Sequence, residues 1–178
     1  MTLLLGRESN PKMCRQRVIN NFFSALFHDL PESVTRDIIS PVKQATDDLP
    51  NIVKKIENEI VSKELVPLME DFNVKEVTYF TSDEFSNRIQ DTSGRIQIVS
   101  YEELNEKYNN DEFKPVDGKL VRICDHLSAL MEANISIKHG ITSEHLEIGL
   151  ETTVNHYEKN QVINGINVNE FFTRIIEP

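Results

Sequence analysis

The sequence predicts an all-α fold for its 178 residues. Over most of the chain, apolar side chains recur every three to four positions, the spacing that gives a helix one apolar face. Strand-like composition is weak and confined to one region. The hydrophobic fraction of 39% and the charged fraction of 27% are ordinary for a folded globular protein. We therefore expect one helical domain that covers residues 1–178.

Prolines divide the predicted helices of the N-terminal part. A helix is predicted over residues 13–30. Its apolar face would include Val18, Phe22, Leu26 and Leu30. A second helix begins at Pro31, because the missing N–H of a proline costs nothing in a first helical turn. Residues 47–72 predict one long amphipathic helix, which Asp47 or Asp48 would cap.

The region 73–112 carries two kinds of signal. A β-like composition is found at Val74, Val77, Tyr79 and residues 96–99. Short helical patterns cover residues 82–89 and 101–108. Short apolar runs do not distinguish a helix from a strand. A small hairpin or an irregular insertion around 74–100 therefore remains open, with a turn at Gly94.

The C-terminal part returns to clear helical spacing. The pattern predicts a helix from residue 116 to 137, which ends in a basic residue, a histidine and a glycine, the order that helix ends favour. Its buried stripe would consist of Leu120, Ile123, Cys124, Leu127, Leu130 and Met131. Further helices are predicted from Ser143 to Val154 and over 169–176.

The net charge of −10 argues against a protein that binds nucleic acid, since phosphate backbones require clusters of Lys and Arg. The negative net charge does not exclude a small phosphorylated substrate, because a bound divalent cation can reverse the local electrostatic field. Cys14 and Cys124 lie far apart without a CxxC partner, which favours free thiols and a cytoplasmic location. No apolar run is long enough to cross a bilayer, so no membrane partner is expected.

The residues best suited to catalysis begin at His28 and Asp29. Glu32 and Asp37 follow within nine residues of the pair. Imidazole and carboxylate groups together suit Zn, Mn, Co or Mg. The His-Asp dipeptide alone is weak evidence, because a solvated helix end could carry the same residues. It gains weight here because an aromatic-rich helix precedes it, and unpaired polar groups are costly next to a buried helix.

The run HDLPESVTRDIISPVK resembles the second motif of HD-domain phosphohydrolases, and is most similar to the branch that contains bacterial 5′-deoxynucleotidases. In that family an upstream histidine, the adjacent His-Asp pair and a distant aspartate hold a divalent metal ion. The run CDHLSALMEA has the shape of the later family motif, which implies that Asp125 is the distant ligand. The resemblance spans about residues 18–135 and implies a helical bundle.

The resemblance also implies a role for each site residue. One divalent ion would be held by His28, Asp29 and Asp125. Glu32 would position or deprotonate the attacking water, and Asp37 would contact the sugar or support the metal site. Simpler interpretations stay open: an acidic residue that favours the first turn of a helix for Glu32, an ion pair for Asp37, and a solvated helix carboxylate for Asp125. The remaining histidines are interpreted as surface or helix-end residues: His126, His139, His145 and His156.

The sequence departs from the family pattern at the first ligand. The upstream family histidine belongs a few tens of residues before the pair, yet His28 is the first histidine of the sequence. Met1–Gly6 has the composition of a helix interior, so we expect that an N-terminal segment carrying this ligand is missing. The alternative is a naturally degenerate site.

Three functions are compatible with these residues. The first is an HD enzyme that uses one divalent ion to hydrolyse the phosphate monoester of a nucleotide. The second is a degenerate HD domain that binds a nucleotide or a protein without hydrolysis, which the absent histidine favours. The third is a helical adaptor whose carboxylates are surface charge and bind no metal tightly. Exposed helical faces are compatible with a homodimer.

Overall fold

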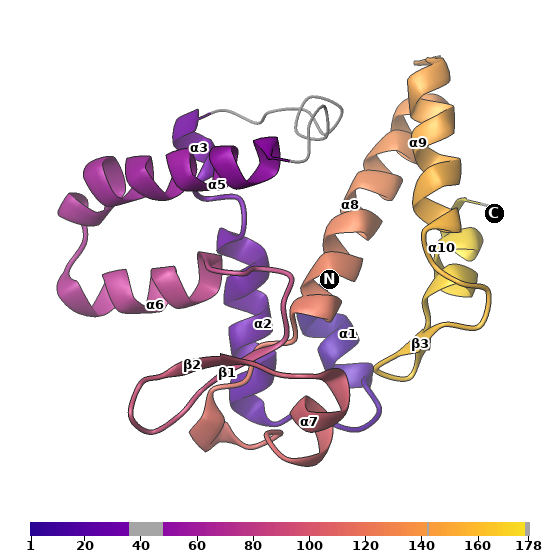
Figure 1. The fold of residues 1–178 in the computed structure, drawn as a ribbon. Helices are drawn as coiled ribbons and strands as arrows, with labels where there is room; N and C mark the ends of the chain where they lie inside the picture. Colours follow the sequence, from indigo (N-terminus) through magenta and orange to yellow (C-terminus); the bar gives the residue numbers. More distant parts are fainter. Residues whose placement is uncertain (36–47, 142, 177–178) are drawn as a thin grey trace. The chain divides into compact units, whose positions relative to one another are not determined.

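The computed structural model describes residues 1–35, 48–141 and 143–176, and it confirms an all-α fold with two short hairpins (Figure 1). The chain divides into two compact units. Unit 1 comprises Met1–Ala25 and Phe85–Pro178, and unit 2 comprises Leu26–Glu84. The single domain over residues 1–178 stays a prediction. Among the described residues, no helix combines the length and apolar composition that a membrane span requires.

Three helices of unit 1 pack around an apolar core. These are α8 (Gly118–Lys138), α9 (Glu144–Asn155) and α10 (Val168–Ile176), which contact one another. The core consists of Ile123, Leu127, Leu130, Tyr157, Val168 and Phe172. The predicted stripe of the longest helix is confirmed, since its apolar residues are buried or, for Met131, packed against this core. The helix ends as predicted, with Gly140 at φ +85° just beyond it.

The remaining helices of unit 1 are shorter. Helix α1 covers Thr2–Glu8, where the sequence predicts helix interior, and α7 covers Tyr101–Glu106. A capping box opens α7: the Ser100 side chain accepts from the Glu103 amide, and the Glu103 side chain accepts from the Ser100 amide. Both thiols of the chain are free, and Cys124 on α8 is buried.

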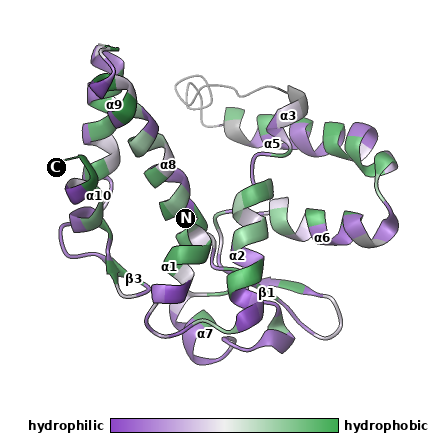
Figure 2. Cartoon of the chain, turned by 180° about the vertical axis from the view of Figure 1, so that it is seen from behind, coloured by the Kyte–Doolittle hydropathy of each residue, from purple (hydrophilic) through white to green (hydrophobic). Residues whose placement is uncertain are grey.

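Helix α2 (Arg15–Phe27) begins in unit 1 and buries a polar face, contrary to the sequence-based prediction. Its buried residues are Arg17, Asn20, Asn21 and Ser24. The predicted apolar face is partly exposed, with Phe22 at 41% and Leu26 at 59%. Figure 2 shows both apolar and polar residues along α2. The physical reason is hydrogen bonding: Asn20 Nδ2 donates to the Lys114 carbonyl at 2.8 Å. Hydrogen bonds of this kind offset the cost of removing polar groups from water, so these side chains are tolerated in the interior.

Two antiparallel hairpins complete unit 1. The first joins β1 (Arg88–Gln90) to β2 (Ile96–Ile98) through a turn in which Gly94 has φ +85°, so the hairpin around 74–100 is confirmed there. The helix predicted over 82–89 is wrong, because this segment leads into β1. The second hairpin joins β3 (Val162–Ile163) to β4 (Ile166–Asn167). This hairpin was not predicted, although the Asn-Gly dipeptide in its turn is a strong local signal.

Unit 2 contains α3 (Glu32–Thr35), α5 (Leu49–Ile60) and α6 (Asp71–Thr81). The long helix predicted over 47–72 is shorter: it passes into a π-helical turn and then a 3-10 turn that carries Pro67. A proline lacks the N–H that a continuing helix requires. The β-like residues around Val74–Tyr79 lie in α6, where Tyr79 and Phe80 are buried.

Candidate functional site

The predicted metal-binding pair follows directly on the end of α2. The Leu30 amide donates to the Phe27 carbonyl at 2.9 Å, so the chain turns tightly at His28 and Asp29. Within this turn His28 Nε2 lies 3.1 Å from Asp29 Oδ2, with the imidazole 15% exposed and the carboxylate 65% exposed. Nitrogen and oxygen donors at this separation can contact the same divalent ion. The pair therefore fits the donor chemistry of a metal site in unit 2.

Glu32 lies one turn beyond the pair. Its amide donates to the Asp29 carbonyl at 2.9 Å, and its half-buried side chain belongs to the first turn of α3. The same turn is closed by Ser33, whose hydroxyl donates to the Leu30 carbonyl at 2.6 Å. The structure thus keeps the imidazole and both carboxylates within one short, hydrogen-bonded segment. Asp37 lies outside the described residues.

Asp125 belongs to unit 1, where it is half-buried on α8. The predicted ligand set therefore draws on both units, and Asp125 as the third ligand stays a prediction. Over residues 1–35, 48–141 and 143–176, no three His, Cys, Asp or Glu side chains gather in a group that could hold a metal ion. The structure supplies two adjacent donors, His28 and Asp29, rather than a complete coordination sphere.

His126, beside Asp125, is half-buried and not the surface residue that the sequence analysis expects. Its Nδ1 lies 2.8 Å from the Tyr157 hydroxyl oxygen. Burial lowers the pKa of His126, and the positive charge of Arg122 lowers it further. Burial also raises the pKa of Tyr157 to about 12. A protonated Tyr157 hydroxyl can therefore donate to a neutral imidazole at pH 7, which requires the His126 tautomer with its proton on Nε2.

Two cations precede Asp125 on α8, and the sequence analysis assigned no role to them. Lys119 and Arg122 are exposed and three residues apart, which places their side chains on neighbouring parts of one helix face. In a chain with a net charge of −10, this pairing of cations is the signal that could have identified them.

Comparison with known protein families decides the classification. The family model of the HD domain matches residues 1–154. The chain belongs to the HD-domain family. The matched range of this HD domain contains the adjacent pair His28–Asp29 as well as Asp125. No curated protein and no solved structure matches the chain significantly.

Membership explains the chemistry of the turn after α2. HD domains are generally hydrolases that bind divalent metal ions, and the donors of such a site are imidazole and carboxylate groups. The HD domain described here presents both kinds of donor side by side at the His28–Asp29 turn. This turn is accordingly the candidate metal centre of the protein.

Proposed function

We propose that this HD domain is a metal-dependent phosphohydrolase that cleaves a phosphate monoester of a nucleotide, as the 5′-deoxynucleotidase-like branch of the family does. The observation that carries the proposal is the contact between His28 and Asp29, followed one turn later by Glu32. This order of an imidazole, a metal-binding carboxylate and a second carboxylate supplies both a cation site and a base. A small phosphorylated nucleotide is the proposed substrate, and a homodimer stays a prediction.

Each residue has a role in the proposed reaction. His28 and Asp29 would hold one divalent ion, with Asp125 as a further ligand. Zn, Mn, Co and Mg all accept such donors, and additional oxygen ligands favour Mg or Mn. When bound, a divalent ion neutralises phosphate charge and lowers the pKa of a water molecule.

The Glu32 carboxylate would accept the proton of the attacking water. Water oxygen then bonds to phosphorus while the bond from phosphorus to the sugar oxygen breaks. The electron pair of that bond goes to the sugar oxygen, which takes up a proton from solvent and leaves as a hydroxyl on the side that we assign to Asp37.

The test combines elemental analysis with phosphate release from a panel of nucleoside monophosphates. Asp29→Ala and Asp125→Ala should each lose the bound metal and therefore turnover. Glu32→Ala should keep the metal and lose about 10²- to 10⁴-fold in turnover, the usual contribution of a general base. Glu147→Ala, an exposed carboxylate on α9, serves as the control and should change neither quantity. Full metal retention in Asp125→Ala would contradict the proposed ligand set.

A degenerate HD domain that binds a nucleotide or a protein without hydrolysis is the second candidate, because no three His, Cys, Asp or Glu side chains of the described residues gather in a group that could hold a metal ion. If this candidate is correct, the purified protein should contain less than one metal ion per chain and should show no phosphate release that depends on Glu32. The same measurements therefore separate the two candidates.

A further inference from the structure

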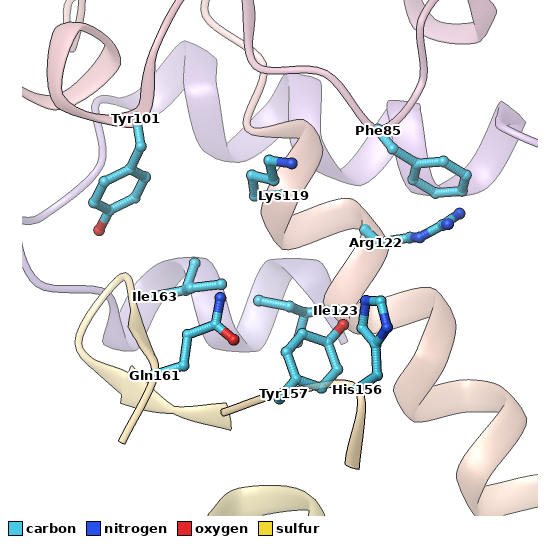
Figure 3. Close-up of a pocket in the computed structure, with 9 residues that line it drawn as sticks. All are labelled: Phe85, Tyr101, Lys119, Arg122, Ile123, His156, Tyr157, Gln161 and Ile163. Atoms are coloured by element: carbon cyan, nitrogen blue, oxygen red, sulfur yellow. The ribbon is translucent and has the colours of Figure 1, made fainter. Parts of the chain in front are cut away.

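A pocket of about 470 Å³ lies within unit 1 (Figure 3). Its walls come from α8, the end of α9, the β3–β4 hairpin, Tyr101 of α7 and the segment at Phe85. None of the residues predicted as metal ligands lines it. Its volume falls in the range of about 300–1,000 Å³ that is typical of small-molecule sites.

The pocket concentrates positive charge in an acidic chain. Lys119 and Arg122 line it from α8, with the Arg122 side chain turned toward Phe85, and no carboxylate is among its lining residues, although the net charge is −10. In the part of the chain that the structure describes, neither cation forms an ion pair. Cations without an internal counter-ion in a concave site are suited to an anionic ligand.

Packing fixes the position of Arg122. Its guanidinium carbon lies 4.2 Å from the centre of the Phe85 ring, a cation–π contact. The backbone at Phe85 is held against the start of α8, since a Cβ added to Gly118 would lie 2.4 Å from the Phe85 carbonyl carbon. The Lys119 amide donates to Asn87 Oδ1 at 3.1 Å and fastens the same segment. The guanidinium is therefore pre-organised, which lowers the entropy cost of binding.

Two further polar groups of the pocket can donate hydrogen bonds. The Tyr101 hydroxyl oxygen accepts from the Asn164 amide at 2.9 Å, so its own proton is left for another acceptor. The Gln161 side-chain oxygen accepts from the Glu158 amide at 3.3 Å, which leaves its NH₂ group as a donor. A fully ionised phosphate group has hydrogen-bond acceptors and no donors, so it matches such a set of donors.

The pocket also has apolar lining. Ile123, Ile163 and the buried ring of Tyr157 supply it, with Gln161 and His156 beside them. The Tyr157 ring is held by Phe172 at 5.2 Å between ring centres and by the hydrogen bond to His126. This surface can cover an aromatic or aliphatic body, so the pocket joins an anion-binding edge to an apolar wall.

We propose that this pocket binds a phosphorylated small molecule with an aromatic body, with Lys119 and Arg122 on its phosphate group. A nucleoside monophosphate represents this ligand class. The binding needs no metal ion and does not depend on hydrolysis at the His28–Asp29 turn. Guanidinium groups form paired hydrogen bonds with phosphate oxygens, whereas an ammonium group acts as a point charge, so the two residues contribute differently.

The test is calorimetric titration of the metal-free full chain in EDTA with AMP, adenosine and inorganic phosphate. AMP should bind more tightly than adenosine. Arg122→Gln and Lys119→Gln should each weaken AMP about 10- to 100-fold, the value of one charge-assisted contact, and should bring its affinity close to that of adenosine. Lys138→Gln is the matched control, because Lys138 is an exposed cation on the same helix outside the pocket. The affinity of this variant for AMP should be unchanged.

Equal binding of AMP and adenosine, or an equal loss in all three variants, would overturn the proposal. Asp29→Asn separates it from the proposed hydrolysis, since this variant should keep metal-free AMP binding while losing the metal and turnover. Metal-dependent phosphate release by a protein that fails to bind AMP in EDTA would refute the pocket and leave the proposed hydrolase intact.

Discussion

Arg17 and Asp117 form a completely buried ion pair in unit 1, with Arg17 Nη2 2.7 Å from Asp117 Oδ2. Asp117 is the centre of a larger network. The same oxygen accepts from Asn164 Nδ2 at 2.7 Å, the other oxygen accepts from the Leu120 amide, and the Asp117 amide donates to Asn21 Oδ1. Burial of a charge is tolerated here because nearly every polar group has a partner.

We expect Arg17→Met to lower the free energy of unfolding by about 3–5 kcal/mol, because it leaves the Asp117 carboxylate buried without its counter-ion. Urea denaturation followed by circular dichroism measures the change. Lys63→Met is the control: its ion pair with Glu59 is exposed at 72% and 71%, and exposed pairs contribute little to stability. Similar losses of unfolding free energy in the two variants would show that the buried ion pair contributes no more to stability than the exposed one.

At the scale of single elements, local pattern was sufficient for α8. Its apolar residues recur at helical spacing, and Asp117 caps it by accepting from the Leu120 amide at 3.0 Å. The burial of α2 could not be predicted in this way, because its buried side chains depend on partners about a hundred residues away in sequence: Arg17 pairs with Asp117 at a separation of 100. A single-helix pattern contains no information on such partners.

The start of α8 also depends on one glycine. Gly118→Ala would place a Cβ 2.4 Å from the backbone at Phe85 and Ser86, so the segment must shift, and we expect a loss of about 1–3 kcal/mol in the free energy of unfolding. Gly149→Ala is the control within α9, where nothing lies within 4 Å of the added Cβ. This control should gain about 0.5–1 kcal/mol from helix propensity. Thermal denaturation compares the two, and an unchanged Gly118→Ala protein would contradict the close contact.

At the scale of the whole molecule, the sequence predicted the fold class and part of the candidate site. His28, Asp29 and Glu32 are neighbours in sequence, so a local motif was sufficient to find them together. Asp125 lies in the other unit, and no local pattern encodes how distant segments meet. The cationic pocket was missed for the same reason, because its walls come from five separate segments of unit 1.

Acid should destabilise the folded chain through several surface carboxylates. Hydrogen bonds from the Ser93 hydroxyl and the Arg95 amide lower the pKa of Asp91. Hydrogen bonds from the Ser100 amide and the Lys107 side chain lower the pKa of Glu103. Hydrogen bonds from the Gln16 amide and the Cys14 side chain lower the pKa of Asp111. A carboxyl whose pKa is lower when folded contributes stability above its unfolded pKa and loses it as the pH falls through the folded pKa.

The midpoint of urea denaturation should therefore begin to fall near pH 6.5, because the unfolded chain protonates His126 more readily than the folded chain, and it should fall further below about pH 5 as the carboxylates are protonated. The triple variant Asp91→Asn, Glu103→Gln, Asp111→Asn should fall less steeply on acidification. Curves of equal slope for the variant and the parent protein would show that other groups control the acid response.

The division of unit 1 into two segments sets the order in which the protein can be completed during synthesis. Unit 2 is one continuous stretch, Leu26–Glu84, which leaves the ribosome whole before most of unit 1 exists. Unit 1 has to wait, because Arg17 meets Asp117 only after a further 100 residues have been made. Until then the polar face of α2 faces water, where its amide and guanidinium groups are fully solvated. The face of α2 that waits for its partner is thus polar, and a solvated polar face is less prone to aggregation than an apolar one would be.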